Sequence, residues 1–238
     1  MSSRFSDAIR AENALGFAAV IPDIKCRSPR DGDLLRGRDP VETARALVRG
    51  GAPVLSVVTE PERFGGSAEL LRAVAEAADV PVLRKDFIVT EAQLHETLEL
   101  GAAAVLLMCS VTGEKNLMTL YEKALKLGLE PLVEVHTAPE MALAKKLDAK
   151  LVGVNNRDIL TLERDNGGPG LTAALAPLAP ADAVLVSESG ILDPAGAALA
   201  VSAGANAVLV GTALWLTDNM GAMYQSLRVE RGSSCGRL

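Results

Sequence analysis

Five polar residues that can hold or move a proton each stand where an apolar, β-prone run of the sequence ends. They are two lysines, two glutamates and an asparagine: Lys25, Lys85, Glu134, Asn155 and Glu188. A parallel strand that is covered on both faces reads as a continuous apolar run. A single polar residue at such an end is ordinary, but the same placement five times predicts that these side chains meet at one site.

Ammonium and carboxylate groups packed together are suited to acid–base catalysis, because each shifts the pKa of the other. We expect burial to lower the pKa of Lys85 toward neutrality. An ion-pair lattice that only closes the protein is the alternative. It explains one or two pairs, but not the carboxylate, guanidinium and hydroxyl groups that follow or close the same runs: Asp23, Ser28, Arg157 and Ser189.

The elements that must position these residues alternate between strands and helices. The sequence predicts eight strands, at Ala18–Ile24, Val54–Val58, Val82–Leu83, Ala104–Met108, Pro131–Val135, Leu151–Val154, Ala183–Val186 and Ala207–Val210. Amphipathic segments between them predict helices at Val41–Arg49, Ala68–Ala77, Glu91–Leu100, Glu114–Leu127 and Pro139–Leu147. This alternation is typical of parallel βαβ units.

Eight such units in 238 residues match one closed (β/α)8 barrel, the TIM-barrel type of α/β fold with a parallel eight-stranded core. We predict a single domain over residues 1–238. A short N-terminal helix is expected within 1–16, with Phe5, Ile9 and Leu15 toward one face. An open doubly wound sheet is the second possibility, but no G-x-G-x-x-G motif follows the first strand.

Composition excludes several classes of function. The net charge of −6 with no basic run argues against nucleic-acid and membrane partners. Three scattered cysteines and two histidines make a disulfide framework or a His-rich metal site improbable, and they favour a reducing, cytoplasmic location. The uncharged stretch 194–217 is interrupted by glycines, so we interpret it as a helix followed by a buried strand.

Glycines after the last two predicted strands indicate an anion site. Ser189-Gly190 follows the seventh strand and Gly211-Thr212 follows the eighth, where TIM barrels commonly bind phosphate through backbone N–H groups. The irregular segment Leu160–Pro169 follows the sixth strand on the same rim. It is either a plain connection or a mobile lid.

Eight motifs resemble, in order and spacing, those of indole-3-glycerol-phosphate synthase. They are Asp23-Ile-Lys-Cys-Arg-Ser-Pro29, Ser56-Val-Val-Thr-Glu-Pro61, Phe64-Gly-Gly-Ser67, Leu83-Arg-Lys-Asp-Phe87, Leu132-Val-Glu-Val-His136, Gly153-Val-Asn-Asn-Arg-Asp158, Ser187-Glu-Ser-Gly-Ile191 and Val210-Gly-Thr212. The resemblance runs from about Val20 to Leu216 and implies a barrel of tryptophan (aromatic amino acid) biosynthesis that uses no cofactor and no metal. It also implies a monomer or weak homodimer, with other tryptophan-pathway enzymes as candidate partners.

The implied reaction converts a sugar phosphate, 1-(2-carboxyphenylamino)-1-deoxyribulose 5-phosphate, to indole-3-glycerol phosphate with loss of carbon dioxide and water. By resemblance, Lys85 is the general acid of ring closure, while Glu134 and Lys25 move protons in the dehydration. The resemblance implies that Asn155 and Glu188 hold substrate hydroxyls and charged groups, and that Arg157 lies near the carboxylate. The implied phosphate ligands are Ser28, Ser189, Gly190, Gly211 and Thr212, assisted by Lys25, and the implied walls of the aryl pocket are Phe64, Leu83, Phe87 and Leu106.

The sequence departs from the family pattern in three places. Asp23 stands where the family has a glutamate, the N-terminal extension that packs over the barrel mouth is reduced to Met1–Gly16, and the loop Asp165–Gly170 is rich in glycine. Two other functions stay open. In the first, the protein is an aldolase-like sugar-phosphate lyase with Lys85 as a Schiff-base nucleophile. In the second, the barrel is a non-catalytic paralogue that binds a phosphorylated metabolite or a partner protein.

Overall fold

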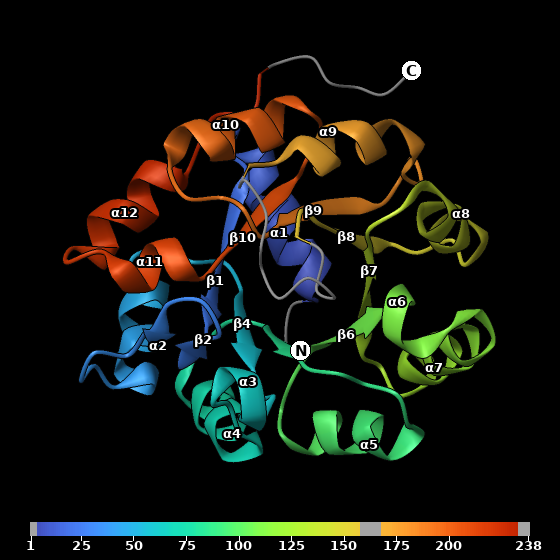
Figure 1. The fold of residues 1–238 in the computed structure, drawn as a ribbon, viewed down its shortest axis with the longest axis horizontal. Helices are drawn as coiled ribbons and strands as arrows, with labels where there is room; N and C mark the ends of the chain where they lie inside the picture. Colours follow the sequence, from blue (N-terminus) through green and yellow to red (C-terminus); the bar gives the residue numbers. More distant parts are fainter. Residues whose placement is uncertain (1–3, 158–167, 233–238) are drawn as a thin grey trace.

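Eight parallel strands close into a barrel in the computed structural model, which describes residues 4–157 and 168–232 (Figure 1). Around the ring the order is β1-β10-β9-β8-β7-β6-β5-β4, and β1 closes it by pairing with both β10 and β4. The strands are β1 (Ala19–Ile24), β4 (Leu55–Val58), β5 (Val82–Lys85), β6 (Ala104–Met108), β7 (Glu130–Val135), β8 (Leu151–Asn155), β9 (Val184–Glu188) and β10 (Ala207–Val210). This confirms the predicted TIM barrel and excludes the open sheet.

Helices surround the barrel (Figure 1). They are α2 (Pro40–Arg49), α3 (Pro61–Phe64), α4 (Ala68–Ala77), α5 (Glu91–Glu99), α6 (Cys109–Thr112), α7 (Glu114–Lys126), α8 (Ala138–Lys146), α9 (Gly170–Leu175) with the 3-10 turn η2 (Ala176–Leu178), α10 (Pro194–Ser202), α11 (Thr212–Leu216) and α12 (Met220–Leu227). The five helices predicted between strands are confirmed. Side-chain caps explain where several begin: Thr90 with Gln93 and Thr137 with Glu140 form capping boxes.

Small branched side chains fill two kinds of core. One cluster lies inside the barrel and contains inward residues such as Ile21, Leu83, Leu106 and Leu132, all at most 2% exposed. Two further clusters lie between the strands and the outer helices. Because both strand faces are buried, the strands read as the unbroken apolar runs seen in the sequence.

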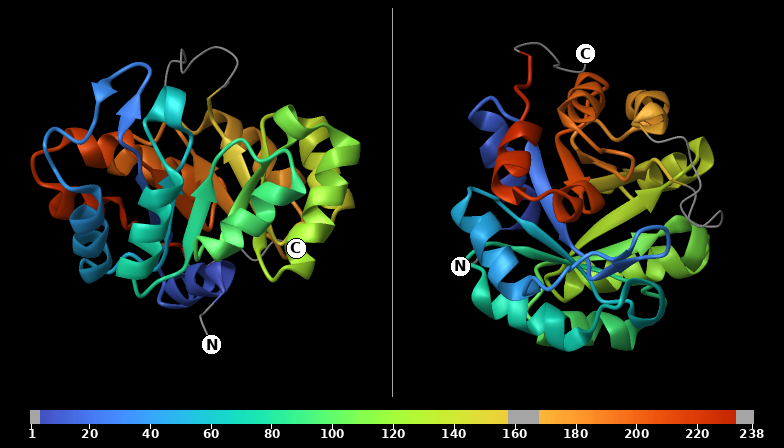
Figure 2. Two further views of the ribbon diagram at one scale, coloured as in Figure 1. Left: turned by 90° about the horizontal axis from the view of Figure 1, so that it is seen from below. Right: turned by 60° about the vertical axis from the view of Figure 1, so that its left-hand side comes forward.

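Helix α1 (Phe5–Ala14) closes the end of the barrel at which the strands begin (Figure 2, left). Phe5 and Ile9 are fully buried in the inner cluster, as predicted. The Ser6 backbone N–H donates to Glu130, the first residue of β7, at 3.2 Å. The prediction for Leu15 is wrong, because it lies beyond the last helical turn and is 71% exposed.

The opposite end, where the strands finish, carries the hairpin of β2 (Arg27–Ser28) and β3 (Gly32–Asp33) (Figure 2, left). The N-terminal segment described here therefore does not cover this mouth. Stretch 194–217 forms α10, β10 and α11, which confirms a helix followed by a buried strand. Within 4–157 and 168–232, no helix combines the length and apolarity needed to cross a membrane.

Candidate active site

A cavity, partly open to solvent, lies at the carboxyl ends of the strands. Most of the residues singled out from the sequence line it: Asp23, Lys25, Phe64, Lys85, Phe87, Leu106, Asn155, Arg157, Ser189, Gly190, Gly211 and Thr212. The barrel geometry brings them together because every parallel strand ends at the same rim.

Four other predicted site residues lie away from the cavity lining. Glu134 and Glu188 are fully buried beneath it and reach it through Lys85. Leu83 points inward two residues before Lys85 and is fully buried in the barrel interior, so it does not wall the cavity. Ser28 is 1% exposed, and its hydroxyl accepts from the Arg30 N–H at 3.2 Å, which stabilises the β2–β3 turn.

Lys85 is held between two carboxylates. Its Nζ lies 3.1 Å from Glu188 Oε2 and 3.3 Å from Glu134 Oε2. Burial lowers the pKa of Lys85, but the charges of Glu188, Glu134 and Asp23 outweigh that effect and raise the pKa above its ordinary value. The expectation that burial would bring this lysine toward neutrality is therefore wrong, and Lys85 is a protonated ammonium.

The same arrangement raises the pKa of Glu188. Burial, and then the charge of Glu134, raise its pKa to about 7 even though Lys85 acts in the opposite direction. Glu188 Oε1 occupies the space over Gly153 of β8, where an added Cβ would come within 1.9 Å of that oxygen. Gly153 thus leaves open the space in which the Glu188 carboxylate lies when it binds Lys85.

Asp23 lies on the wall of the cavity at the junction of β1, β4 and β10. Its Oδ1 accepts from Ser56 Oγ at 2.6 Å, and its backbone carbonyl accepts from Trp215 Nε1 at 2.8 Å. A Cβ at Gly211 would lie 3.3 Å from Asp23 Oδ2. The short carboxylate is therefore fixed against β4 and packed closely against the end of β10.

Aromatic rings form one side of the cavity. Glu60 caps α3 by accepting from the Phe64 N–H at 3.0 Å, which orients the Phe64 ring under Lys25, whose Nζ is 4.9 Å from the ring centroid. Arg63 lies 5.5 Å from the ring centroid of Phe87. Sequence reasoning did not identify Glu60 and Arg63, because their role depends on a four-residue helix that has no detectable periodicity.

The family model for indole-3-glycerol phosphate synthase matches residues 1–227. The chain belongs to the indole-3-glycerol phosphate synthase family. It is 49% identical to the indole-3-glycerol phosphate synthase of Kineococcus radiotolerans over 195 residues, which is 82% of this chain and 70% of that protein. It is 45% identical to the Thermococcus kodakarensis enzyme of the same name over 201 residues, 84% of this chain and 88% of that one.

Among solved structures, the chain resembles the N-acetylmannosamine-6-phosphate 2-epimerase from Clostridium perfringens. The TM-score is 0.65 at 16% identity, and the match covers 82% of this chain and 86% of the epimerase. At this level of identity the likeness concerns the fold alone.

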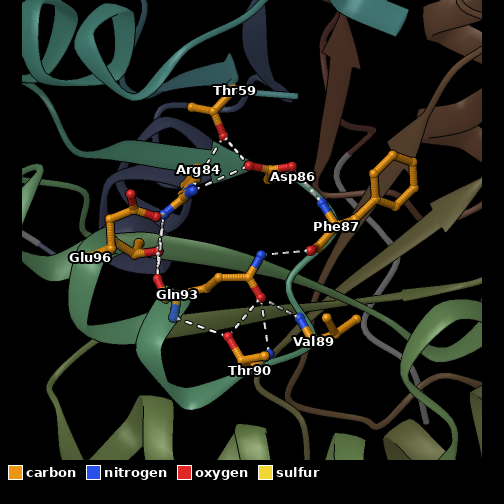
Figure 3. A network of polar contacts seen from close by, with 9 residues as sticks. Thr59, Arg84, Asp86, Phe87, Val89, Thr90, Gln93 and Glu96 are labelled. Carbon is orange, nitrogen blue, oxygen red and sulfur yellow. Dashed lines mark hydrogen bonds and ion pairs between the residues drawn. The ribbon is translucent and has the colours of Figure 1, made fainter. Parts of the chain in front are cut away.

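In this synthase-family barrel, a buried polar network surrounds the backbone on both sides of Lys85 (Figure 3). Arg84 is 5% exposed, and it donates to Thr59 Oγ1 at 3.2 Å, to Asp86 Oδ2 at 3.2 Å and to Glu96 Oε2 at 2.7 Å. Thr59 Oγ1 also donates to Asp86 Oδ2 at 2.6 Å. The residues before and after Lys85 are thus tied to β4 and α5, and this leaves the lysine side chain a single direction, inward.

Replacing Arg84 with methionine should disturb both stability and catalysis, because it leaves the half-buried Asp86 without its cation. We expect a loss of about 3 kcal/mol in the free energy of unfolding and a fall of about 10-fold in kcat/KM from misplacement of Lys85. Urea denaturation and steady-state kinetics measure the two effects. Arg45→Met is the matched control, since Arg45 pairs with Glu42 on the surface and should change neither by much. Equal effects from both variants would contradict this role.

Asn156 is a structural residue of the site that sequence reasoning did not single out. Its Nδ2 donates to the Glu188 carbonyl at 2.8 Å and to the Ser189 carbonyl at 3.2 Å, and its Oδ1 accepts from the Thr172 N–H at 3.0 Å. These bonds hold Ser189 in a left-handed conformation, with φ of 61°. Its place next to Asn155 in the Gly153-Val-Asn-Asn motif was the available signal.

Other cavity residues were also missed, and they are mainly apolar: Pro29, Val58, Met108, Ile191, Leu192, Leu209 and Val210. Several of them are the last residues of their strands or the first residues after them, and apolar side chains there resemble ordinary core positions in the sequence. The predicted lid 160–169 and the loop 165–170 fall largely on residues 158–167, outside the described part of the chain.

Proposed function

We propose that this family member is a carboxy-lyase that converts 1-(2-carboxyphenylamino)-1-deoxyribulose 5-phosphate to indole-3-glycerol phosphate. The observation that carries the proposal is the Lys85 ammonium, held by Glu134 and Glu188 at the floor of a cavity with an aromatic wall. The family membership supports the same reaction.

Ring closure places negative charge on the ketone oxygen, and a fixed ammonium stabilises that charge and donates a proton. The raised pKa of Lys85 keeps this proton available at neutral pH, and the carboxylates that cause the shift fix the direction of the side chain. Glu134 and Lys25 then move protons in the dehydration, and Asp23 completes the set of acid–base groups. Asn155 binds substrate hydroxyls from the cavity lining, and Glu188, buried beneath it, acts on the substrate through Lys85.

Loss of carbon dioxide from an aryl carboxylate is favoured where apolar groups exclude water. Phe64, Phe87 and Leu106 supply that environment on one part of the cavity lining, and Arg157 binds the carboxylate before it leaves. Ser189, Gly190, Gly211 and Thr212 lie on the rim after β9 and β10, the usual phosphate position of this fold. Substrate is thereby held across the mouth, with its ketone above Lys85.

The test is incubation of the protein with the carboxyphenylamino-deoxyribulose phosphate while following indole fluorescence and release of carbon dioxide. Appearance of both signals supports the proposal, and absence of both under conditions where the substrate binds rejects it. Treatment with borohydride in the presence of substrate separates the Schiff-base alternative, which leaves covalent substrate on Lys85. The raised pKa of Lys85 disfavours that alternative, because an imine-forming lysine must be neutral.

Sulfate binding should weaken as the pH rises through about 7, the pKa of Glu188. Below that pH the carboxyl is neutral, and above it a negative charge appears beneath the cavity, on the residue that precedes Ser189 and Gly190, while sulfate itself keeps its charge. Isothermal titration between pH 6 and pH 8 measures the change, and Glu188→Gln should abolish the pH dependence. An affinity that is flat with pH in the wild type would contradict this assignment.

A further inference from the structure

The proposed reaction takes up one proton from water in every turnover. The ketone oxygen leaves as water and needs two protons, whereas the substrate supplies only one, from the carbon next to nitrogen. The carboxylate leaves as neutral carbon dioxide and releases none. This inference rests on the proposed function, and it raises the question of how a solvent proton reaches acid–base groups beneath the bound substrate.

The groups that exchange protons are shielded from solvent on the cavity side. Glu134 is fully buried, and the Lys85 side chain is 19% exposed at the cavity floor. A substrate that fills the cavity covers that floor. A second route that reaches Glu134 without crossing the cavity would supply the proton while the substrate is bound.

His136 lies in the right place to provide that route. It follows β7 two residues after Glu134, so both side chains project from the same face of the chain. His136 Nε2 is 3.7 Å from Glu134 Oε1, and His136 Nδ1 is 3.9 Å from Glu140 Oε2 on α8. The side chains of His136 and Glu140 are 14% and 20% exposed, so the row runs from the buried carboxylate to the protein surface.

Glu140 Oε2 accepts from the backbone N–H groups of His136 at 2.6 Å and Thr137 at 3.1 Å, but the inner part of the row has unused hydrogen-bonding capacity within the described residues. Neither ring nitrogen of His136 has a hydrogen-bond partner there, and neither does Glu134 Oε1. Glu134 binds Lys85 through its other oxygen, Oε2. The two carboxylate oxygens thus face different groups: one faces the catalytic lysine, the other the histidine. His136 is not part of the cavity lining, so substrate does not contact it.

One further titratable group faces the row. Cys109 of α6 lies near both carboxylates, and burial, followed by the charges of Glu140 and Glu134, raises the pKa of its thiol to about 12. It is therefore a neutral thiol across the working pH range. Glu134 and water are then the groups that can exchange a proton with the His136 ring.

We propose that His136 is a positioning residue that relays a proton from water beside Glu140 to Glu134. Nε2–H donates its proton to Glu134 Oε1, and Nδ1 accepts a proton from water bound beside Glu140. Reorientation of the ring, which then carries its proton on Nδ1, turns that N–H toward Glu134 and restores the donor for the next transfer. One proton enters Glu134 and one leaves solvent, so charge and protons balance the uptake that the reaction requires.

The test compares three variants of the full-length protein. His136→Gln keeps a polar group of similar size but cannot relay a proton, and we expect kcat to fall by about 10²-fold, the lower end of the contribution of a positioned proton-transfer group, with KM nearly unchanged. Glu140→Gln should lower kcat less, because glutamine preserves the capping box with Thr137 and bulk water replaces the lost carboxylate. His95→Gln is the matched control, since His95 forms a similar pair with Glu91 at 3.9 Å on the exposed face of α5.

Chemical rescue separates a relay from a structural role. Added imidazole should restore part of the kcat of His136→Ala, and the restored rate should rise with the concentration of the free base and its conjugate acid. A kcat for His136→Gln within twofold of the wild type overturns the proposal. So does a loss that imidazole does not restore in His136→Ala. If the wild-type protein produces no indole-3-glycerol phosphate at all, it is the proposed function that fails.

Discussion

Replacing Lys85 with alanine is expected to lower kcat by about 10²–10⁴-fold, the range for loss of a positioned acid. The ammonium acts on the ketone oxygen as charge develops there, so KM should change much less than kcat. Steady-state kinetics and active-site titration measure the effect. The exposed Lys145 on α8 provides the matched control, and Lys145→Ala should retain wild-type activity. A Lys85 variant that keeps most of its kcat would remove this residue from the mechanism.

The same substitution should also make stability depend on pH. In the wild type, Lys85 lowers the pKa of Glu188, which is nonetheless about 7 against an ordinary value of 4.5. Without Lys85 that pKa rises further, so the folded protein retains a proton that the unfolded chain loses. A raised folded-state pKa has no effect at low pH, where both states are protonated, and costs stability as the pH rises above the unfolded value.

The free energy of unfolding of Lys85→Ala should therefore be closest to that of the wild type near pH 5, and it should become lower than the wild-type value toward pH 8. The difference at pH 8 should be about 3–5 kcal/mol, typical of a buried ion pair that has lost one partner. Urea denaturation at several pH values measures it. A stability difference that stays constant with pH would contradict the assignment of Lys85 as the cation that lowers the pKa of Glu188.

Gly153→Ala is expected to inactivate the enzyme even though no polar group is removed. The new methyl group would lie 1.9 Å from Glu188 Oε1, and Gly153 is in the middle of a fully buried strand that cannot retreat. Glu188 must then leave Lys85. We expect a loss of about 1–3 kcal/mol from overpacking and a fall of about 10²-fold in kcat from misplaced catalytic groups.

Kinetics and denaturation measure both effects of this substitution, and a crystal structure of the variant shows where Glu188 goes. Gly221→Ala in α12 is the control, since its Cβ meets only Asn219 Oδ1 at 3.8 Å and alanine favours a helix. Gly153→Ala with normal kcat would show that the contact of Glu188 with Lys85 is not needed for turnover.

The barrel and the position of the site were predictable from the sequence because they follow from chain-wide patterns. Eight apolar runs that alternate with amphipathic segments are compatible with few folds. A polar residue at the end of an apolar run, such as Lys85 or Glu134, indicated where each strand reaches the site. The ordering of these residues around the mouth then follows from the order of the strands.

What could not be predicted depends on contacts between residues distant in sequence. The pKa of Lys85 depends on three carboxylates that meet it only in the folded barrel, so burial alone suggested the wrong direction. Leu83 and Lys85 project from the same face of β5. Only the depth of the cavity decides that Lys85 lines it while Leu83 lies below it in the core, and the sequence does not show that depth. His136 was not singled out as a site residue, because nothing in the sequence shows that its ring faces Glu134.

The closure of the ring by β1 has a consequence for the newly made chain. Ala19 pairs with Ala207, so one seam of the barrel joins the first of its strands along the sequence to the last, which leaves the ribosome after the other seven. Until β10 is synthesised, β1 and β9 each present an open apolar edge to other chains. Aggregation during synthesis should therefore depend on how quickly β10 reaches its place, and substitutions that weaken the β1–β10 seam should lower the yield of soluble protein before they affect the rate of catalysis.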